Sequence, residues 1–146
     1  MKITGYVDLQ INGYAGIDFN GDDLSVEAIR FACDRLSRDG VAKILATLIT
    51  DDLERVLKRM DTIHEAWDTV PEVSQMLGGF HLEGPFLNPE PGYIGAHPAQ
   101  YAMTANLDLM KRMYDAARGR LRIVTLAPEC DPELRVTRWL AEKGII

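Results

Sequence analysis

A glutamate between an apolar run and a Gly-Pro turn is the first candidate for chemistry in this sequence. Glu83 stands directly after the apolar segment 76–82 and directly before Gly84-Pro85. A carboxylate held between a strand end and a tight turn is well placed to bind a divalent cation or to take part in acid–base catalysis. The competing interpretation is a glutamate that forms an ion pair or caps a helix.

The three histidines have different prospects. His97 lies in a segment rich in glycine and proline, where burial is uncommon, and both a functional and a structural role are open for it. His81 shares a strand face with Glu83, because side chains alternate along a strand, and we expect it to be a hydrogen-bonded core residue. His64 lies beside the apolar stripe of an expected helix, and we assign it no role.

Polar side chains also alternate at the end of the first apolar run. Asp8, Gln10 and Asn12 would point the same way from an extended segment. The glycines that follow lack the G-x-G-x-x-G spacing, and the sequence has no P-loop lysine, so a dinucleotide or P-loop site is not expected.

These candidates are carried by a chain that alternates strands and helices. We expect strands at 3–10, 43–50, 76–82 and 121–127. We expect helices after caps at Ser25 and Thr104, over 53–67, and after the pair Asp131-Pro132. Pro71 should end the second helix, and segment 83–103, with four prolines, should be an irregular loop of the kind that is usually functional.

Four strand–helix units in series predict an α/β fold with a parallel sheet. One architecture that fits is a doubly wound sheet of four or five strands. The other is the first half of a (β/α)8 TIM-type barrel, truncated at both ends, and Ile145-Ile146 as the opening of a fifth strand favours it. In both architectures the functional site lies at the carboxyl ends of the strands.

Composition and charge limit the classes of partner and the compartment that we expect for this protein. The chain has 146 residues and a formal net charge of −6, which disfavours nucleic acid, since phosphate binding requires clustered lysine and arginine. We expect no membrane span, because no apolar run approaches the roughly 20 residues that one requires, and no signal peptide, because Met1-Lys2 opens directly into a strand-like segment. Cys33 and Cys130 are expected to be buried thiols of a cytoplasmic protein.

Five segments resemble one family in content and order. They are 5–13, 47–50, 81–89, 95–98 and 124–129, and the most specific features are His-Leu-Glu-Gly-Pro-Phe at 81–86 and Gly-Ala-His at 95–97. Together they resemble N-acetylglucosamine-6-phosphate deacetylase, a family of metal-dependent barrel hydrolases in the amidohydrolase superfamily. The resemblance implies that 1–146 is a partial barrel domain of a hydrolase that converts N-acetylglucosamine 6-phosphate to glucosamine 6-phosphate and acetate.

The resemblance also implies roles for individual residues. Glu83 matches the ligand of one divalent metal ion, zinc or similar, and His97 matches the catalytic histidine that contacts the substrate carbonyl, with Ala96 beside it in the substrate pocket. Gln10 and Asn12 occupy the places where many amidohydrolases have His-x-His, and neutral amides are poor metal ligands, so the second-metal position should be vacant.

The family's two further metal histidines and its proton-transferring aspartate have no counterpart in this sequence. We therefore expect the chain alone to be inactive. The alternative is a non-catalytic half barrel that forms a homo-oligomer or docks on a complementary half, since open strand edges would otherwise be exposed. A cyclic-amide hydrolase is a more distant alternative, disfavoured by Gln10 and Asn12.

Overall fold

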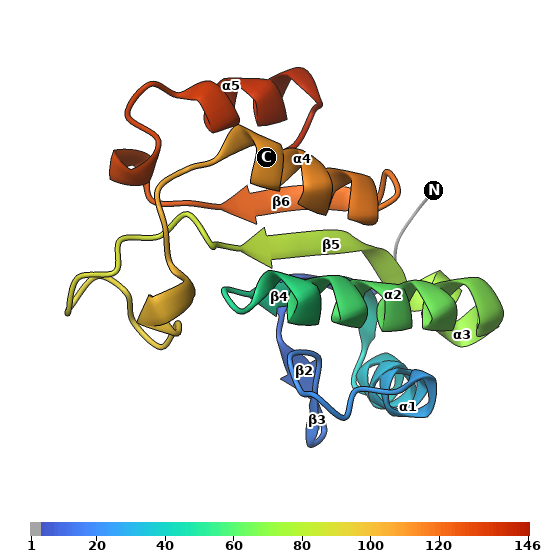
Figure 1. Ribbon diagram of the computed structural model, residues 1–146. Coiled ribbons are helices and arrows are strands. Elements are labelled where there is room, and N and C mark those ends of the chain that lie inside the picture. The colour runs from blue at the N-terminus through green and yellow to red at the C-terminus, as the bar shows by residue number, and fades with distance from the viewer. Residues whose placement is uncertain (1–3) are drawn as a thin grey trace.

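A computed structural model describes residues 4–146 as a parallel α/β fold (Figure 1). Strands β1 (Tyr6–Ile11), β4 (Val41–Ile49), β5 (Leu77–Glu83) and β6 (Leu121–Thr125) form one sheet in the order β1-β4-β5-β6, with every pairing parallel. The expected parallel sheet with helical connections is confirmed. The start of the first strand, expected at Ile3, lies outside the described residues.

Within residues 4–146, five α-helices and two short 3₁₀ helices lie between the strands or after the last of them. They are α1 (Val26–Arg38), α2 (Leu53–Thr69), α3 (Pro71–Met76), η1 (Ala99–Tyr101), α4 (Leu107–Ala116), η2 (Pro128–Cys130) and α5 (Arg135–Glu142). Polar side chains cap the first two helices. Ser25 accepts a hydrogen bond from the Ala28 amide at the start of α1, as expected, and Asp52 accepts from the Glu54 and Arg55 amides at the start of α2.

The helices pack on one face of the sheet. Alternate residues Ile44, Ala46 and Leu48 of β4 belong to a core cluster that includes residues of all five helices. Thr47 lies between them in sequence, so its side chain points to the other face. It pairs in register with His81 of β5. The face that carries Thr47 and His81 therefore lies opposite the helical layer.

Two helix starts differ from the sequence-based expectation. Asn106, not Thr104, caps α4, because residue 105 is still bound to η2 through the Cys130 carbonyl. Helix α5 begins at Arg135 rather than after Pro132, because Leu134 has a left-handed φ of 55° that interrupts the helix. Pro71 follows the end of α2 as expected, but it also occupies the first turn of α3, which the sequence analysis missed.

A short hairpin after β1 was also missed. Strands β2 (Gly13–Tyr14) and β3 (Ile17–Asp18) pair antiparallel just beyond the carboxyl end of β1. At the other end of the chain, the Ile146 amide donates to the Arg122 carbonyl at 3.0 Å, and the Ile146 carbonyl accepts from the Val124 amide at 2.9 Å. These two bonds place Ile146 beside β6 where a next strand would pair.

The remaining sequence-based expectations concern cysteines and membranes. Cys33 and Cys130 are both free and buried, and burial raises the pKa of the Cys33 thiol to about 12, which keeps it protonated and inert. Within residues 4–146, none of the helices combines the length and apolar character that crossing a membrane requires.

Candidate active site

The carboxyl ends of β1, β4, β5 and β6, which we call the rim, bring the candidate residues together. The strands are parallel, so these four ends meet at the same edge of the sheet. In Figure 1 the β5 and β6 arrowheads point to the left, and the chain after β5 extends beyond them. Glu83 is the last residue of β5, and Gln10 lies near the end of β1.

The Glu83 carboxylate contacts two of the other candidates. Gln10 Nε2 donates a hydrogen bond to Glu83 Oε1 at 2.8 Å, although the two residues are on strands separated by β4. His97 Nε2 lies 3.9 Å from the same oxygen. Among the described residues no lysine or arginine pairs with Glu83, and it caps no helix, so the contact with His97, which is an ion pair only when the imidazole is protonated, is the one ion pair open to it.

The backbone around Glu83 is fixed from both neighbouring strands. Thr50 Oγ1 donates to the Glu83 carbonyl at 3.1 Å, and the Gly84 amide donates to the Thr125 carbonyl at 2.9 Å. Gly84 has a φ of 92°, and a Cβ there would collide with the Thr50 hydroxyl. Glycine is therefore required after Glu83, and the Gly84–Pro85 bond that follows is cis.

His97 reaches the rim from the loop after β5. Its amide donates to the Ile94 carbonyl at 3.3 Å, which turns the chain back toward the sheet. The side chains of His97 and Glu83 are 17% and 18% exposed, so both are mostly shielded but open to a ligand. Within residues 4–146, the buried Nδ1 atom of His97 has no hydrogen-bond partner. An unpaired buried polar atom is costly, and a ligand or an ordered water at this site would satisfy it.

A cavity of about 530 Å³ lies against these residues, and we call it the rim cavity. It is lined by Asn12, Asp18, Asn20, Ile49, Glu83 and 93–97. Ala96 and Asn12 are thus placed at the same cavity as Glu83 and His97. Gln10 does not line it but contacts Glu83 from the side. The structure brings all five sequence-predicted site residues to one place, and their roles remain predictions.

Asn20 is a rim residue that the sequence analysis missed. Its Nδ2 donates to the Thr47 carbonyl at 3.1 Å, and its Oδ1 accepts from the Ile49 amide at 2.9 Å. The side chain therefore bonds to β4 as a neighbouring strand would, at the point where β1 has ended. The sequence signal was the turn-forming pair Asn20-Gly21 close behind the first strand.

The rim offers an incomplete set of metal ligands. In the part of the chain that the structure describes, no three histidine, cysteine, aspartate or glutamate side chains are close enough to share an ion. Asp18 and Glu83 are the two carboxylates among the residues that line the rim cavity, and Glu83 lies within 4 Å of His97. Gln10 turns its amide nitrogen, a donor, toward Glu83, so it holds the carboxylate and is not arranged as a ligand.

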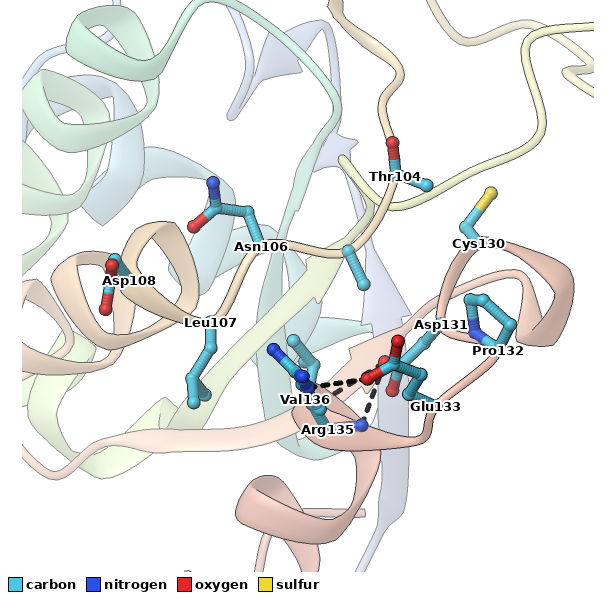
Figure 2. A pocket seen from close by; sticks show the side chains of 11 residues that line it. Thr104, Asn106, Leu107, Asp108, Cys130, Asp131, Pro132, Glu133, Arg135 and Val136 are labelled. Carbon is cyan, nitrogen blue, oxygen red and sulfur yellow. Dashed lines mark hydrogen bonds and ion pairs between the residues drawn. The ribbon is translucent and has the colours of Figure 1, made fainter.

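A second groove, of about 490 Å³, lies between the starts of α4 and α5 (Figure 2). Asp131 accepts hydrogen bonds there from the backbone of Arg135 and Thr137 and from the Thr137 hydroxyl. Burial alone raises the pKa of Asp131, but these hydrogen bonds outweigh it and hold the pKa below its ordinary value. Asp131 therefore caps α5, as Asn106 caps α4, and neither is free for chemistry.

The fold and the rim define a parallel α/β domain with a carboxylate and an imidazole at one cavity. Comparison with known proteins adds a family resemblance. The chain is 33% identical over 148 residues to N-acetylglucosamine-6-phosphate deacetylase of Bacillus subtilis (strain 168), which covers 99% of this chain and 36% of that protein. It is 34% identical over 144 residues to the Bos taurus protein of the same name, covering 97% and 34% respectively.

Relatives with other names and solved structures agree with this resemblance. The chain is 31% identical over 147 residues to N-acetylgalactosamine-6-phosphate deacetylase of Shewanella sp. (strain ANA-3), covering 99% of this chain and 35% of that protein. The crystal structure of N-acetyl-D-glucosamine-6-phosphate deacetylase from Mycobacterium smegmatis has a TM-score of 0.82 at 26% identity, covering 99% of this chain and 36% of the other. No protein-family model matches the chain.

The resemblance that the sequence motifs indicated is thereby confirmed. The chain resembles N-acetylglucosamine-6-phosphate deacetylases along nearly all of its own length. It spans about a third of the length of the curated relatives that it matches, at 36% and 34%.

Proposed function

We propose that this chain supplies part of the active site of a hydrolase that removes the acetyl group from N-acetylglucosamine 6-phosphate. The products are glucosamine 6-phosphate and acetate. The observation that carries the proposal is the meeting of Glu83, Gln10 and His97 at the rim, in a chain that resembles these deacetylases.

Glu83 is the residue that would hold the metal, one divalent ion such as zinc. A bound ion of this kind supplies hydroxide at neutral pH by lowering the pKa of its water toward about 7. The Glu83 carboxylate fits this role because no cationic side chain of residues 4–146 other than His97 lies within ion-pair distance. Gln10 and Asn12 are neutral amides, which supports a single ion rather than two.

His97 would bind the substrate. Its imidazole would donate a hydrogen bond to the acetamide oxygen, where negative charge develops as the amide is attacked. Donors placed in this way contribute about 2.7–4 kcal/mol in comparable oxyanion sites. The unpartnered Nδ1 and the position of Ala96 on the same cavity wall support a ligand-binding role for this turn.

We infer that residues 1–146 form part of a (β/α)8 barrel. The strand order follows chain order, and the helices lie on one face, as in successive units of a closing barrel. A doubly wound sheet would reverse its order and carry helices on both faces. The remaining metal ligands and the proton-transferring aspartate would come from polypeptide outside this sequence.

A chain that supplies a single metal ligand should not turn over substrate alone. Catalytic zinc sites use three protein ligands and a water molecule. We therefore expect residues 1–146 in isolation to release no acetate from N-acetylglucosamine 6-phosphate, with or without added Zn²⁺.

The second candidate function is a non-catalytic half barrel that dimerises or docks on a complementary half. The observation that favours it is the outer strand β1, where Tyr6, Val7 and Leu9 are 77%, 49% and 54% exposed. Size-exclusion chromatography with light scattering tests this candidate. A stable dimer would support it, and a well-behaved monomer would count against it.

A chimera tests the deacetylase proposal. Residues 1–146 would replace the matching segment of the Bacillus subtilis relative. Acetate release would be measured with N-acetylglucosamine 6-phosphate and with N-acetylgalactosamine 6-phosphate. We expect Zn²⁺-dependent release, lost in Glu83→Gln and reduced at least about 100-fold in His97→Asn. Glu129→Gln is the matched control, because Glu129, in η2 after β6, is also a carboxylate that accepts a side-chain amide hydrogen bond, from Asn88.

A folded chimera without activity would contradict the proposal, and so would turnover by the isolated chain. If the chimera does not fold, titration of the isolated chain with Co²⁺ still decides whether Glu83 holds a cation.

A further inference from the structure

The peptide group between Leu9 and Gln10 lies outside the regular ladder of β1. Asp8 pairs with Ile44, and the next pair is Ile11 with Ala46. Between these two pairs β1 advances by three residues and β4 by two. An extra residue of this kind is a β-bulge, which bends a strand and redirects a side chain. The bulge places the Gln10 side chain toward Glu83, two strands away.

Side chains satisfy both polar groups of this one peptide. His81 Nδ1 lies 3.0 Å from the Leu9 carbonyl oxygen, and the Gln10 amide donates to Asp8 Oδ1 at 2.9 Å. A carbonyl oxygen can only accept, so His81 Nδ1 carries the proton. His81 Nε2 lies 2.8 Å from Thr125 Oγ1, which donates to it in the neutral imidazole.

His81 thus connects three strands beneath the rim. It is 4% exposed, and it joins the bulge of β1 to the end of β6 across the face opposite the helices. Rotation of the Leu9–Gln10 peptide would move the Gln10 side chain, whose Nε2 is 2.8 Å from Glu83 Oε1. The imidazole is therefore bonded to the same peptide group whose side chain contacts the Glu83 carboxylate.

We propose that His81 is a positioning residue that holds the β1 bulge so that Gln10 orients the Glu83 carboxylate. The functional meaning of that orientation rests on the proposed function, in which Glu83 holds the metal. The contacts among His81, Leu9, Gln10 and Glu83 do not depend on it.

The test is nuclear magnetic resonance on the full chain, 1–146, uniformly labelled with ¹⁵N and ¹³C. His81→Phe keeps a flat aromatic side chain of somewhat larger size and removes both ring nitrogens. We expect the Gln10 side-chain amide to shift toward the free-amide position and to exchange with solvent about tenfold faster or more. His81→Asn keeps a donor near the Nδ1 position, and we expect it to restore most of the wild-type signal.

His64→Phe is the matched control. His64 is also fully buried and also bonds a backbone carbonyl, that of Ala116 at 2.9 Å, but it lies on α2. We expect this change to destabilise the chain and to leave the Gln10 side-chain amide unchanged. A merely structural histidine at 81 would behave like His64.

Two results would overturn the inference. One is a folded His81→Phe chain with the wild-type Gln10 signal. The other needs no variant: ¹⁵N spectra of wild-type His81 that show the proton on Nε2 would mean that Nδ1 cannot donate to Leu9. Neither readout uses metal or substrate, so failure to bind a cation would count against the proposed function and would leave this inference standing.

Discussion

The two ends of the parallel sheet differ in how far their buried polar side chains have hydrogen-bond and ion-pair partners. At the amino end, Arg120 donates to His64 Nδ1 at 3.0 Å and to Asp68 Oδ1 at 2.6 Å. The carbon of its guanidinium group lies 4.4 Å from the centroid of the Trp67 ring. His64 Nε2 donates to the Ala116 carbonyl, so both nitrogens of this buried ring are satisfied.

At the carboxyl end, the rim leaves polar groups without such partners. His97 Nδ1 is buried without a partner anywhere in residues 4–146, and Glu83 receives a neutral amide where a buried ion pair would have an arginine. Folding alone gains little from this arrangement, since an unpaired buried polar atom costs about 1–3 kcal/mol. The difference is the one we expect if the amino end serves stability and the rim has the binding role proposed for it.

Removing the packing at the amino end should have the largest effect on stability. Phe80 is fully buried, and its ring lies 5.0 Å from the His64 ring and 6.3 Å from that of Trp67. We expect Phe80→Ala to lower the free energy of unfolding by about 3–5 kcal/mol, measured by urea denaturation. Phe80→Leu should lose less, and a loss below about 1 kcal/mol in the alanine variant would contradict this assignment of the core.

The charge state of His64 should make stability depend on pH. Burial lowers the pKa of His64 below its ordinary value of 6.5, and the nearby charges of Arg118 and Arg120 lower it further. The unfolded chain therefore takes up a proton near pH 6.5 while the folded chain does not. Stability from this group is present above that pH and is lost as the pH falls toward the folded pKa.

The check compares wild type with His64→Gln at about pH 7.5 and about pH 5.5. We expect the wild type to lose more unfolding free energy on acidification than the variant does. Equal losses in the two proteins would show that His64 is not held neutral in the fold.

A substitution at the rim should have the smallest effect. His97→Leu removes the buried unpaired nitrogen, so we expect a free energy of unfolding within about 0.5 kcal/mol of wild type, or higher. His64→Leu is the paired experiment at the amino end, and we expect it to cost about 1–3 kcal/mol because Arg120 loses its acceptor. Equal losses at the two positions would remove the contrast between the two ends.

Much of this arrangement could be predicted from the sequence. Apolar periodicity indicated the parallel sheet, and the order of polar residues after each strand placed Glu83, Gln10 and Asn12 at one edge. The expectation that His81 is a hydrogen-bonded core residue is confirmed by its 4% exposure and its two partners.

The rest depends on contacts between distant segments. The Asn20 side chain bonds to β4 only because β1 ends early and the hairpin returns, which no local pattern reports. The β1 bulge is invisible in the sequence, because it arises from a register shift against β4. The start of α5 was misplaced because Asp131 caps it from four residues away, across a left-handed Leu134.

The central claim is that the Glu83 carboxylate can hold a divalent cation beside His97. Titration of the labelled chain with Co²⁺, followed by paramagnetic broadening of its amide signals, tests this most directly. We expect broadening centred on Glu83 and His97 that Zn²⁺ reverses, that Glu83→Gln abolishes and that Glu129→Gln leaves intact. Absence of broadening at the rim at millimolar Co²⁺, or its persistence in Glu83→Gln, would contradict the claim.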